Sequence, residues 1–153
     1  MPRFEAADPN FRARVEEIFQ KASFIAHLGI ELTDVALGTC RSRMTIQPWQ
    51  LQQDGVIHAG VMTTMADHTA GAAAGTLLAP DKVVLSVGLN VHILRPGQAA
   101  ALRCEAHVLK PGRTLSFVEA GVYAETDSAG DRPLLTLTAT MAYVPAPKEL
   151  FLR

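Results

Sequence analysis

The segment QQDGVIHAGVMTTMADHTAGAAAG, residues 52–75, carries the strongest structural signal of this chain. From residue 61 to 78 it contains no proline, and its alanine content favours a helix although each glycine inside a helix costs about 1 kcal/mol relative to alanine. Small residues recur every four positions, which lays narrow strips along the helix where another backbone can approach closely. These strips are Ala66, Ala70 and Ala74, and Gly71 and Gly75. We therefore expect a long core helix packed in the concave face of a curved sheet.

His58 stands nine residues before Asp67. At about 100° per residue, the two would lie on opposite sides of one continuous helix. We therefore expect His58 in the turn before the helix, where Ala59 and Gly60 would offer unpaired backbone N–H groups at the positive end of the helix dipole. Such a helix start suits a developing oxyanion, which makes His58, Ala59 and Gly60 candidate catalytic positions.

Asp67 is a lone carboxylate among apolar and small neighbours. It either faces solvent, or it is paired, hydrogen-bonded or used in chemistry, because burying an unpaired carboxylate is costly. To act together with the helix start, the partner carboxylate must lie one to two turns along the helix or come from a second copy of the chain. A homo-oligomeric active site is therefore plausible.

The remaining segments predict one peripheral helix and several strands. Asp8 and Pro9 predict an N-cap and a first helical residue, and apolar residues follow at helical spacing up to Ala22, with Gly29 beyond the end. A two-residue period predicts a half-exposed strand from Gly38 until Pro48 interrupts it. After the central helix, strands are predicted at 83–94, 100–110, 114–126 and 134–144, as an antiparallel meander joined by turns. The order indicates a single α+β domain.

Composition narrows the function. The chain has 153 residues, with 14 Lys and Arg against 15 Asp and Glu, so its net charge of −1 provides no overall attraction for nucleic acid or an anionic membrane. Cys40 and Cys104 are too few for a disulfide framework, and no leader or membrane-spanning run is indicated, so we expect a cytoplasmic protein. His58, Asp67 and His68 lack the spacing of helical metal ligands, so no metal site is expected.

Several motifs occur in a characteristic order along the chain. They are Leu28-Gly29-Ile30, the Gly55 to Gly60 run followed by Met65-Ala66-Asp67, Leu89-Asn90-Val91 before Leu94-Arg95-Pro96, Gly112-Arg113-Thr114, and Ala139-Thr140. In this order and spacing they resemble the hotdog-fold acyl-CoA thioesterases of the PaaI-like, phenylacetate-pathway type. The resemblance implies a long central helix wrapped by a curved antiparallel sheet, with dimers or dimers of dimers and active sites at the dimer interface. It divides the chain into an N-terminal helical extension (1–27), a hotdog domain (28–147) and a tail (148–153).

The resemblance also implies roles for individual residues. Asp67 matches the catalytic carboxylate, a general base or nucleophile, and Gln52 matches the residue that orients the water or thioester. Ala59 falls where a glycine N–H normally polarises the thioester carbonyl, and Ser86 falls where a serine positions the water. His58 would be a structural and hydrogen-bonding member. Gln52, His58 and Ala59 would come from one subunit and Asp67 from the other.

All but one of the substrate-binding candidates lie in the one clearly basic segment, from Asp81 to Arg113. Taken alone, this segment could be an ordinary solvated face. The resemblance places the region around Gly112 near the coenzyme A phosphates or pantetheine, and Arg113 is the first choice because arginine binds phosphate in a bidentate fork. The full set of binding candidates is Asn90, Lys110, Gly112, Arg113 and Ser116.

The leading hypothesis is an acyl-CoA thioesterase acting on a medium-chain or aryl acyl-CoA, with coenzyme A as part of the substrate and no separate cofactor. One alternative is a non-catalytic acyl-thioester binder, because Ala59 in place of glycine would impair catalysis if that backbone were left-handed. A further alternative is a hotdog dehydratase acting on an acyl carrier, for which His58 is poorly placed as the acid–base residue.

Overall fold

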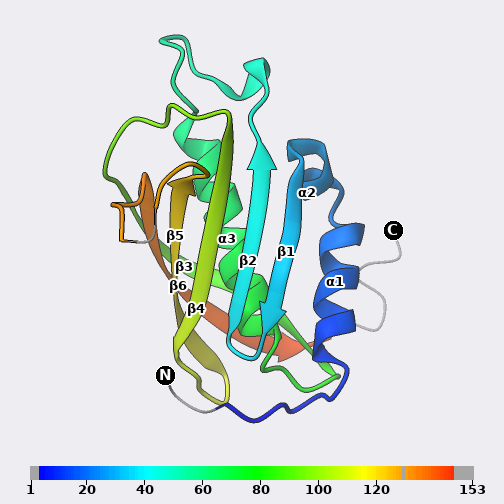
Figure 1. Cartoon of the computed structure of the whole chain (residues 1–153). Coiled ribbons are helices and arrows are strands. Elements are labelled where there is room, and N and C mark those ends of the chain that lie inside the picture. Colours follow the sequence, from blue (N-terminus) through cyan, green and yellow to red (C-terminus); the bar gives the residue numbers. More distant parts are fainter. Residues whose placement is uncertain (1–3, 129, 147–153) are drawn as a thin grey trace.

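The protein is described by a computed structural model of residues 4–128 and 130–146, in which a curved antiparallel sheet wraps around one long helix (Figure 1). The helices are α1 (Phe11–Lys21), α2 (Ser23–Leu28) and α3 (Ala59–Gly75), with a short 3₁₀ helix η1 (Pro48–Gln50). The strands are β1 (Ile30–Ala36), β2 (Thr39–Thr45), β3 (Lys82–Ile93), β4 (Ala101–Lys110), β5 (Leu115–Ala124) and β6 (Leu135–Pro145). Their order in the sheet is β1-β2-β4-β5-β6-β3, so the predicted α+β hotdog architecture is confirmed.

The alanine strip of α3 lies in the core, as predicted: Ala66, Ala70 and Ala74 are fully buried, together with Met62 and Met65 of the same helix. The glycine strip does not make the predicted close approach, because a Cβ at Gly71 would meet nothing within 4 Å. The helix begins and ends earlier than the predicted 61–78, because His58 caps its start and its last regular turn closes at Gly75. Burying these short side chains brings the helix backbone close to the strands.

The N-terminal helix differs from the prediction in two ways. It begins at Phe11 rather than at Pro9, and Asp8 is instead buried, accepting a hydrogen bond from the backbone N–H of Asn10 (2.8 Å) and pairing with Arg14 (3.2 Å). The helix also breaks at Ala22, whose extended backbone (φ −75°, ψ 91°) separates α1 from α2. Neither proline nor glycine marks this break in the sequence.

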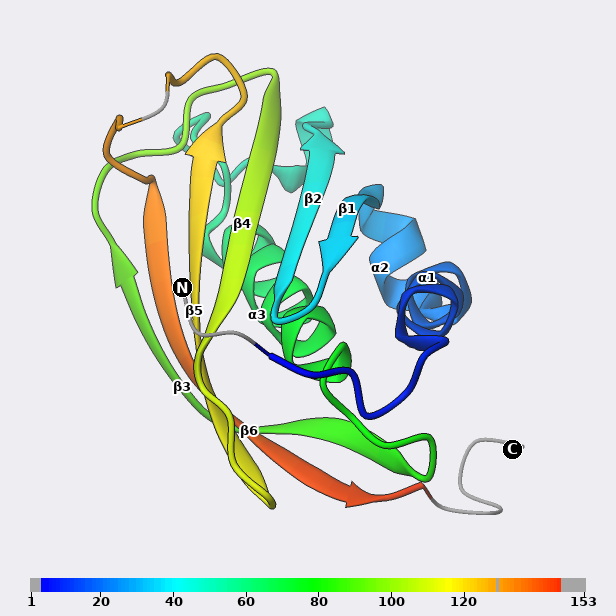
Figure 2. The ribbon, with the colours of Figure 1, turned by 60° about the horizontal axis from the view of Figure 1, so that its bottom comes forward.

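The sheet contains one strand that was not predicted, and one prediction about its order was wrong. Strand β1 was missed because a bulge between Leu32 and Asp34 interrupts its alternation. Strands β4, β5 and β6 form the expected meander. Strand β3, however, pairs with β6 and not with β4, so the connection from β3 to β4 passes across the sheet. As a result β1 and β3 are the two edges of the sheet (Figure 2).

Within the described residues no helix combines the length and hydropathy needed to cross a bilayer. The predicted tail, residues 148–153, lies outside the described residues.

Candidate active site

The turn before α3 has the predicted place and a specific hydrogen-bond pattern. His58 is the N-cap residue, in an extended conformation (φ −62°, ψ 133°), and its Nδ1 atom accepts a hydrogen bond from the N–H of Gly60 (2.9 Å). A Cβ at Gly60 would come within 3.0 Å of this ring atom, so glycine leaves room for the imidazole. The expectation that the Gly60 N–H is unpaired is therefore corrected.

Ala59 is the first residue of α3, and in the described part of the chain no acceptor contacts its N–H. No residue other than glycine has a positive φ there, so Ala59 is not left-handed. Alanine therefore keeps the donor without backbone strain, and the structural reason for expecting impaired catalysis is removed.

The loop leading to His58 is held on both sides. The N–H of His58 donates to the carbonyl of Gln50 (2.9 Å), and the N–H of Gln52 donates to the carbonyl of Val56 (2.8 Å). Gly55 takes the positive φ (79°) that closes this small turn. Gln52 is half-buried on the same loop as His58.

Asp67 and Ser86 meet although they lie on different elements. The Ser86 hydroxyl, on the edge strand β3, donates to the Asp67 carboxylate at 2.6 Å, in the middle of α3. The same hydroxyl lies 3.4 Å from the sulfur of Met141. Asp67 is only partly exposed, and the serine fixes one of its oxygens while the other is left for a further partner.

The two groups of predicted catalytic residues do not meet within one chain. Asp67 follows Ala59 by eight residues on the same straight helix, which at 1.5 Å per residue is a separation of about 12 Å. The predicted catalytic residues of one chain thus form two separate groups, which we name the two half-sites: the helix start with its loop, and the Asp67–Ser86 pair.

The predicted binding residues lie elsewhere. Asn90 is exposed on β3, and the hairpin between β4 and β5 exposes Lys110, Gly112 and Arg113 at the end of the sheet remote from the start of α3 (Figures 1 and 2). A Cβ at Gly112 would collide with the carbonyl oxygen of Leu115, so this turn requires glycine.

Ser116 is the exception among the predicted binding residues. It is fully buried, and its hydroxyl is hydrogen-bonded to the hydroxyl of Tyr143 (2.8 Å). The interpretation of Ser116 as a substrate contact is therefore corrected, because its side chain points into the core. The alternation of strand β5 contains this signal, since Ser116 shares a face with the buried Val118.

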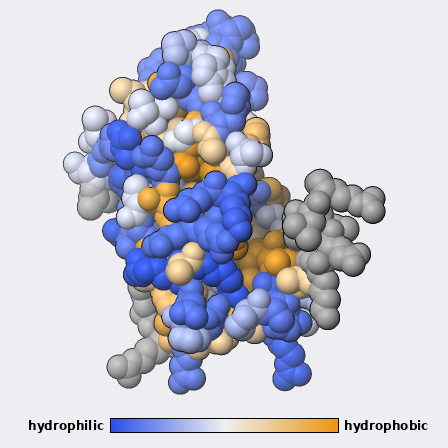
Figure 3. All heavy atoms as spheres, turned by 90° about the vertical axis from the view of Figure 1, so that its right-hand side faces the viewer, coloured by the Kyte–Doolittle hydropathy of each residue, from blue (hydrophilic) through white to orange (hydrophobic). Residues whose placement is uncertain are grey.

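A groove of about 550 Å³ lies between α1 and β1, on the side of the molecule seen in Figure 3. Its lining includes Arg12, Glu16 and Phe19 from α1. Because β1 is the opposite sheet edge from β3, this groove is distinct from both half-sites. Among the residues that the structure describes, no three His, Cys, Asp or Glu side chains are grouped as metal ligands.

The sequence matches the family model described as the thioesterase superfamily over residues 54–130. The chain is 31% identical to the proofreading thioesterase EntH of Klebsiella pneumoniae over 104 residues, covering 67% of this chain and 75% of EntH. It is 26% identical over 100 residues to the 1,4-dihydroxy-2-naphthoyl-CoA hydrolase of Listeria monocytogenes, covering 65% of this chain and 81% of that enzyme.

Solved structures share the architecture. A thioesterase family protein from Silicibacter pomeroyi superposes with a TM-score of 0.83 at 31% identity, covering 89% of this chain and 99% of the other. The PaaI protein of E. coli, from the phenylacetic acid degradation operon, superposes with a TM-score of 0.80 over 90% of this chain and 95% of PaaI, and at 15% identity it is similar in fold. The chain therefore belongs to the thioesterase superfamily, the enzymes that hydrolyse thioesters, and it adopts their hotdog fold.

Proposed function

We propose that the protein hydrolyses a medium-chain or aryl acyl-CoA to the free acid and coenzyme A, in an active site shared by two subunits. One observation carries this proposal: α3 presents an unpaired N–H at Ala59 and a serine-held carboxylate at Asp67, about 12 Å apart on one helix. Thioester hydrolysis needs an N–H donor for the carbonyl oxygen and a carboxylate for the attacking water. In a dimer, the N–H donor of one subunit and the carboxylate of the other can act on the same thioester.

The edge strand β3 supports a symmetric pairing of two copies. It exposes Leu85, Val87 and Leu89 at 50%, 59% and 44%, and the sheet order leaves one side of its backbone without a neighbouring strand. A long apolar edge favours pairing with another strand, and a two-fold axis would pair β3 with β3 in antiparallel fashion. In such a dimer the start of α3 approaches Asp67 of the partner subunit. A dimer of these dimers is compatible with the same site.

The same pairing would also bring the basic hairpin into use. Within one chain, Lys110 and Arg113 lie near the end of α3, because β5 begins where β6 ends. Antiparallel pairing places the hairpin of one subunit toward the end of the sheet where α3 of the other begins. We therefore propose that Lys110 and Arg113 bind coenzyme A phosphates in a site whose N–H donor belongs to the other subunit.

The proposed chemistry needs few groups. The N–H of Ala59 binds the thioester oxygen as it becomes negative, and the partner's Asp67 activates a water or attacks the carbonyl carbon directly. Ser86 holds this carboxylate in place. The leaving thiolate corresponds to a thiol with a pKa of about 8.5, so no dedicated general acid is required. The free, buried Cys40 and Cys104 fit a reducing compartment, and we place the reaction in the cytoplasm.

A panel of acyl-CoAs with a thiol reagent tests the activity. Burial raises the pKa of both Cys40 and Cys104 to about 12, so the native protein contributes little to the thiol signal. We expect coenzyme A release from medium-chain or aryl substrates and loss of release in Asp67→Asn. Binding of acyl-CoA without release of thiol would instead indicate a non-catalytic binder.

A mixed-dimer experiment tests the shared site. Ala59→Pro removes the N–H donor and Asp67→Asn removes the carboxylate, and each variant alone should be inactive. When the two variants are mixed at random, half of the dimers contain one subunit of each kind. Such a mixed dimer has one intact site and one site that lacks both groups, so about a quarter of wild-type activity should return. If the mixture stays as inactive as its components, the site is not shared between subunits.

A further inference from the structure

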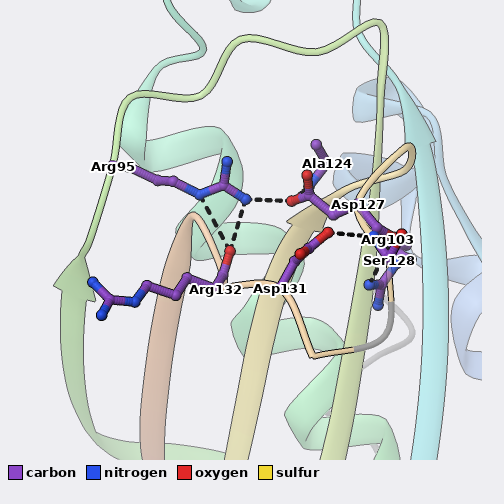
Figure 4. A network of polar contacts seen from close by, with 7 residues as sticks. All are labelled: Arg95, Arg103, Ala124, Asp127, Ser128, Asp131 and Arg132. Atoms are coloured by element: carbon purple, nitrogen blue, oxygen red, sulfur yellow. Dashed lines mark hydrogen bonds and ion pairs between the residues drawn. The ribbon is translucent and has the colours of Figure 1, made fainter.

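The loop between β5 and β6 is fastened by an arginine clamp (Figure 4). The guanidinium of Arg95 donates two hydrogen bonds to the backbone carbonyl of Arg132 (2.7 and 3.2 Å) and forms an ion pair with Asp127. The Asp127 carboxylate also accepts the N–H of Ala124 (3.2 Å), at the end of β5. The clamp therefore fixes the backbone of Arg132 relative to the connection that follows β3.

This clamp lies at the end of the sheet where α3 begins. The N–H of Ile57, just before the N-cap, donates to the carbonyl of Gly97 (2.9 Å), and Gly97 is two residues beyond Arg95. Two contacts thus connect the backbone of Arg132 with the turn that presents the Ala59 N–H: the hydrogen bonds from Arg95 to Arg132, and the hydrogen bond from Ile57 to Gly97. The backbone of Arg132 therefore lies at the same end of the sheet as that donor.

Arg132 differs from the other arginines of this region in its charge environment. Arg95 pairs with Asp127, Arg43 with Glu125, and Arg103 with Glu105 (2.8 Å). Within the part of the chain that the structure describes, no carboxylate pairs with the exposed guanidinium of Arg132. Figure 4 shows its side chain extending away from the clamp, past β6 and toward β3.

We propose that Arg132 is a phosphate anchor for the coenzyme A portion of the substrate, supplied by the subunit that provides the Ala59 N–H. This inference rests on the proposed acyl-CoA function. Its backbone is fixed, its side chain is exposed and uncompensated, and a guanidinium binds phosphate through two parallel hydrogen bonds. Phosphate recognition then has two origins in the dimer, Arg132 in one subunit and the basic hairpin of the other.

Kinetics with two substrates tests this anchor. The Arg132→Ala variant should raise KM for an acyl-CoA by about ten-fold or more, because ten-fold is the smallest loss of affinity expected when one charge-assisted hydrogen bond is removed. Its kcat should stay within two-fold of wild type. KM for the same acyl group on pantetheine, which lacks the nucleotide phosphates, should not change. The KM of Arg132→Lys for an acyl-CoA should lie between those of the wild type and Arg132→Ala, because lysine keeps the positive charge but cannot donate two parallel hydrogen bonds. Arg41→Ala, another exposed arginine on β2, is the matched control and should leave both KM values unchanged.

Calorimetric binding of free coenzyme A separates this inference from the function on which it rests. If the wild type releases and binds coenzyme A while Arg132→Ala keeps the wild-type KM and Kd, the anchor is overturned and the proposed function stands. Equal increases in KM for both substrates overturn it as well, since a phosphate contact cannot affect pantetheine. A wild type that neither hydrolyses acyl-CoA nor binds coenzyme A overturns both.

Discussion

The hydroxyl of Ser86 donates a 2.6 Å hydrogen bond to the carboxylate of Asp67, joining the edge strand β3 to the middle of α3. The serine holds one oxygen of the Asp67 carboxylate, and the second oxygen remains available to accept a further hydrogen bond. In the proposed dimer, that oxygen is the atom that meets the water or thioester of the opposite half-site.

Ser86→Ala should therefore lower kcat by about ten-fold, the effect of losing one hydrogen bond to a charged group, with little change in KM. Asp67→Asn should cost at least about 100-fold, because it removes the base itself. Steady-state kinetics on the best substrate of the panel distinguishes the two. Wild-type kcat in Ser86→Ala would exclude an orienting role for this serine.

Ala59 allows a test of the N–H donor that leaves the helix intact. Proline is favoured at the first position of a helix, and the extended backbone of His58 is what a residue before proline adopts. Ala59→Pro should therefore fold normally and lose about 100- to 1000-fold in kcat. Ala59→Gly is the matched control, since it keeps the donor and should keep kcat. Similar kcat in the two variants would remove the Ala59 N–H from the mechanism.

Arg14 joins α1 to the end of α3. Its guanidinium donates to the carbonyl of Gly75 (3.2 Å), the last residue of α3, and to the carbonyls of Leu78 (2.8 Å) and Ala79 (3.0 Å) in the turn that follows. Lysine cannot reach three carbonyls in this geometry, so Arg14→Lys should reduce the free energy of unfolding by about 1–3 kcal/mol. Denaturant unfolding measures the difference, and Arg12→Lys, exposed on the same helix, should be neutral. An unchanged unfolding free energy in Arg14→Lys would show that these three hydrogen bonds of Arg14 do not stabilise the fold.

The sequence predicted most reliably what short-range patterns encode. The alanine strip predicted the packing of α3, the spacing of His58 and Asp67 predicted the turn before it, and alternation together with turn signals predicted five of the six strands. The missed strand β1 shows the limit of this reasoning, because the bulge between Leu32 and Asp34 destroys the alternation locally. Helix α1 likewise ends at Ala22 without a glycine or proline to mark it.

Contacts between segments far apart in the chain could not be predicted from the sequence. The hydrogen bonds of Arg14 join residues more than sixty positions apart, and the pairing of β3 with β6 depends on the way the whole sheet closes around α3. The candidate site is intermediate: the family resemblance named both Asp67 and Ser86 as catalytic candidates, whereas the hydrogen bond between them and the occupied N–H of Gly60 required coordinates. Side-chain direction at such positions follows from three-dimensional packing.

His68 provides a test of pH dependence. It lies on α3 beside Asp67, its ring meets Phe19 of α1 edge to face at 4.4 Å, and its buried Nε2 atom has no hydrogen-bond partner in the described chain. Burial lowers the pKa of His68, and the charge of Asp67 opposes this only in part. The folded state therefore holds His68 neutral at pH values where the unfolded chain is already protonated.

Below a pH of about 6.5, the unfolded state consequently binds more protons, and stability should fall with pH by at most about 1.4 kcal/mol per pH unit from this one group. His68→Phe should flatten this dependence between pH 7.5 and 5.5 while keeping the contact with Phe19, and it should not reduce stability at pH 7.5 because an unpaired buried nitrogen is removed. Urea unfolding at both pH values measures these slopes, and an acid sensitivity that persists in His68→Phe would assign it to other groups.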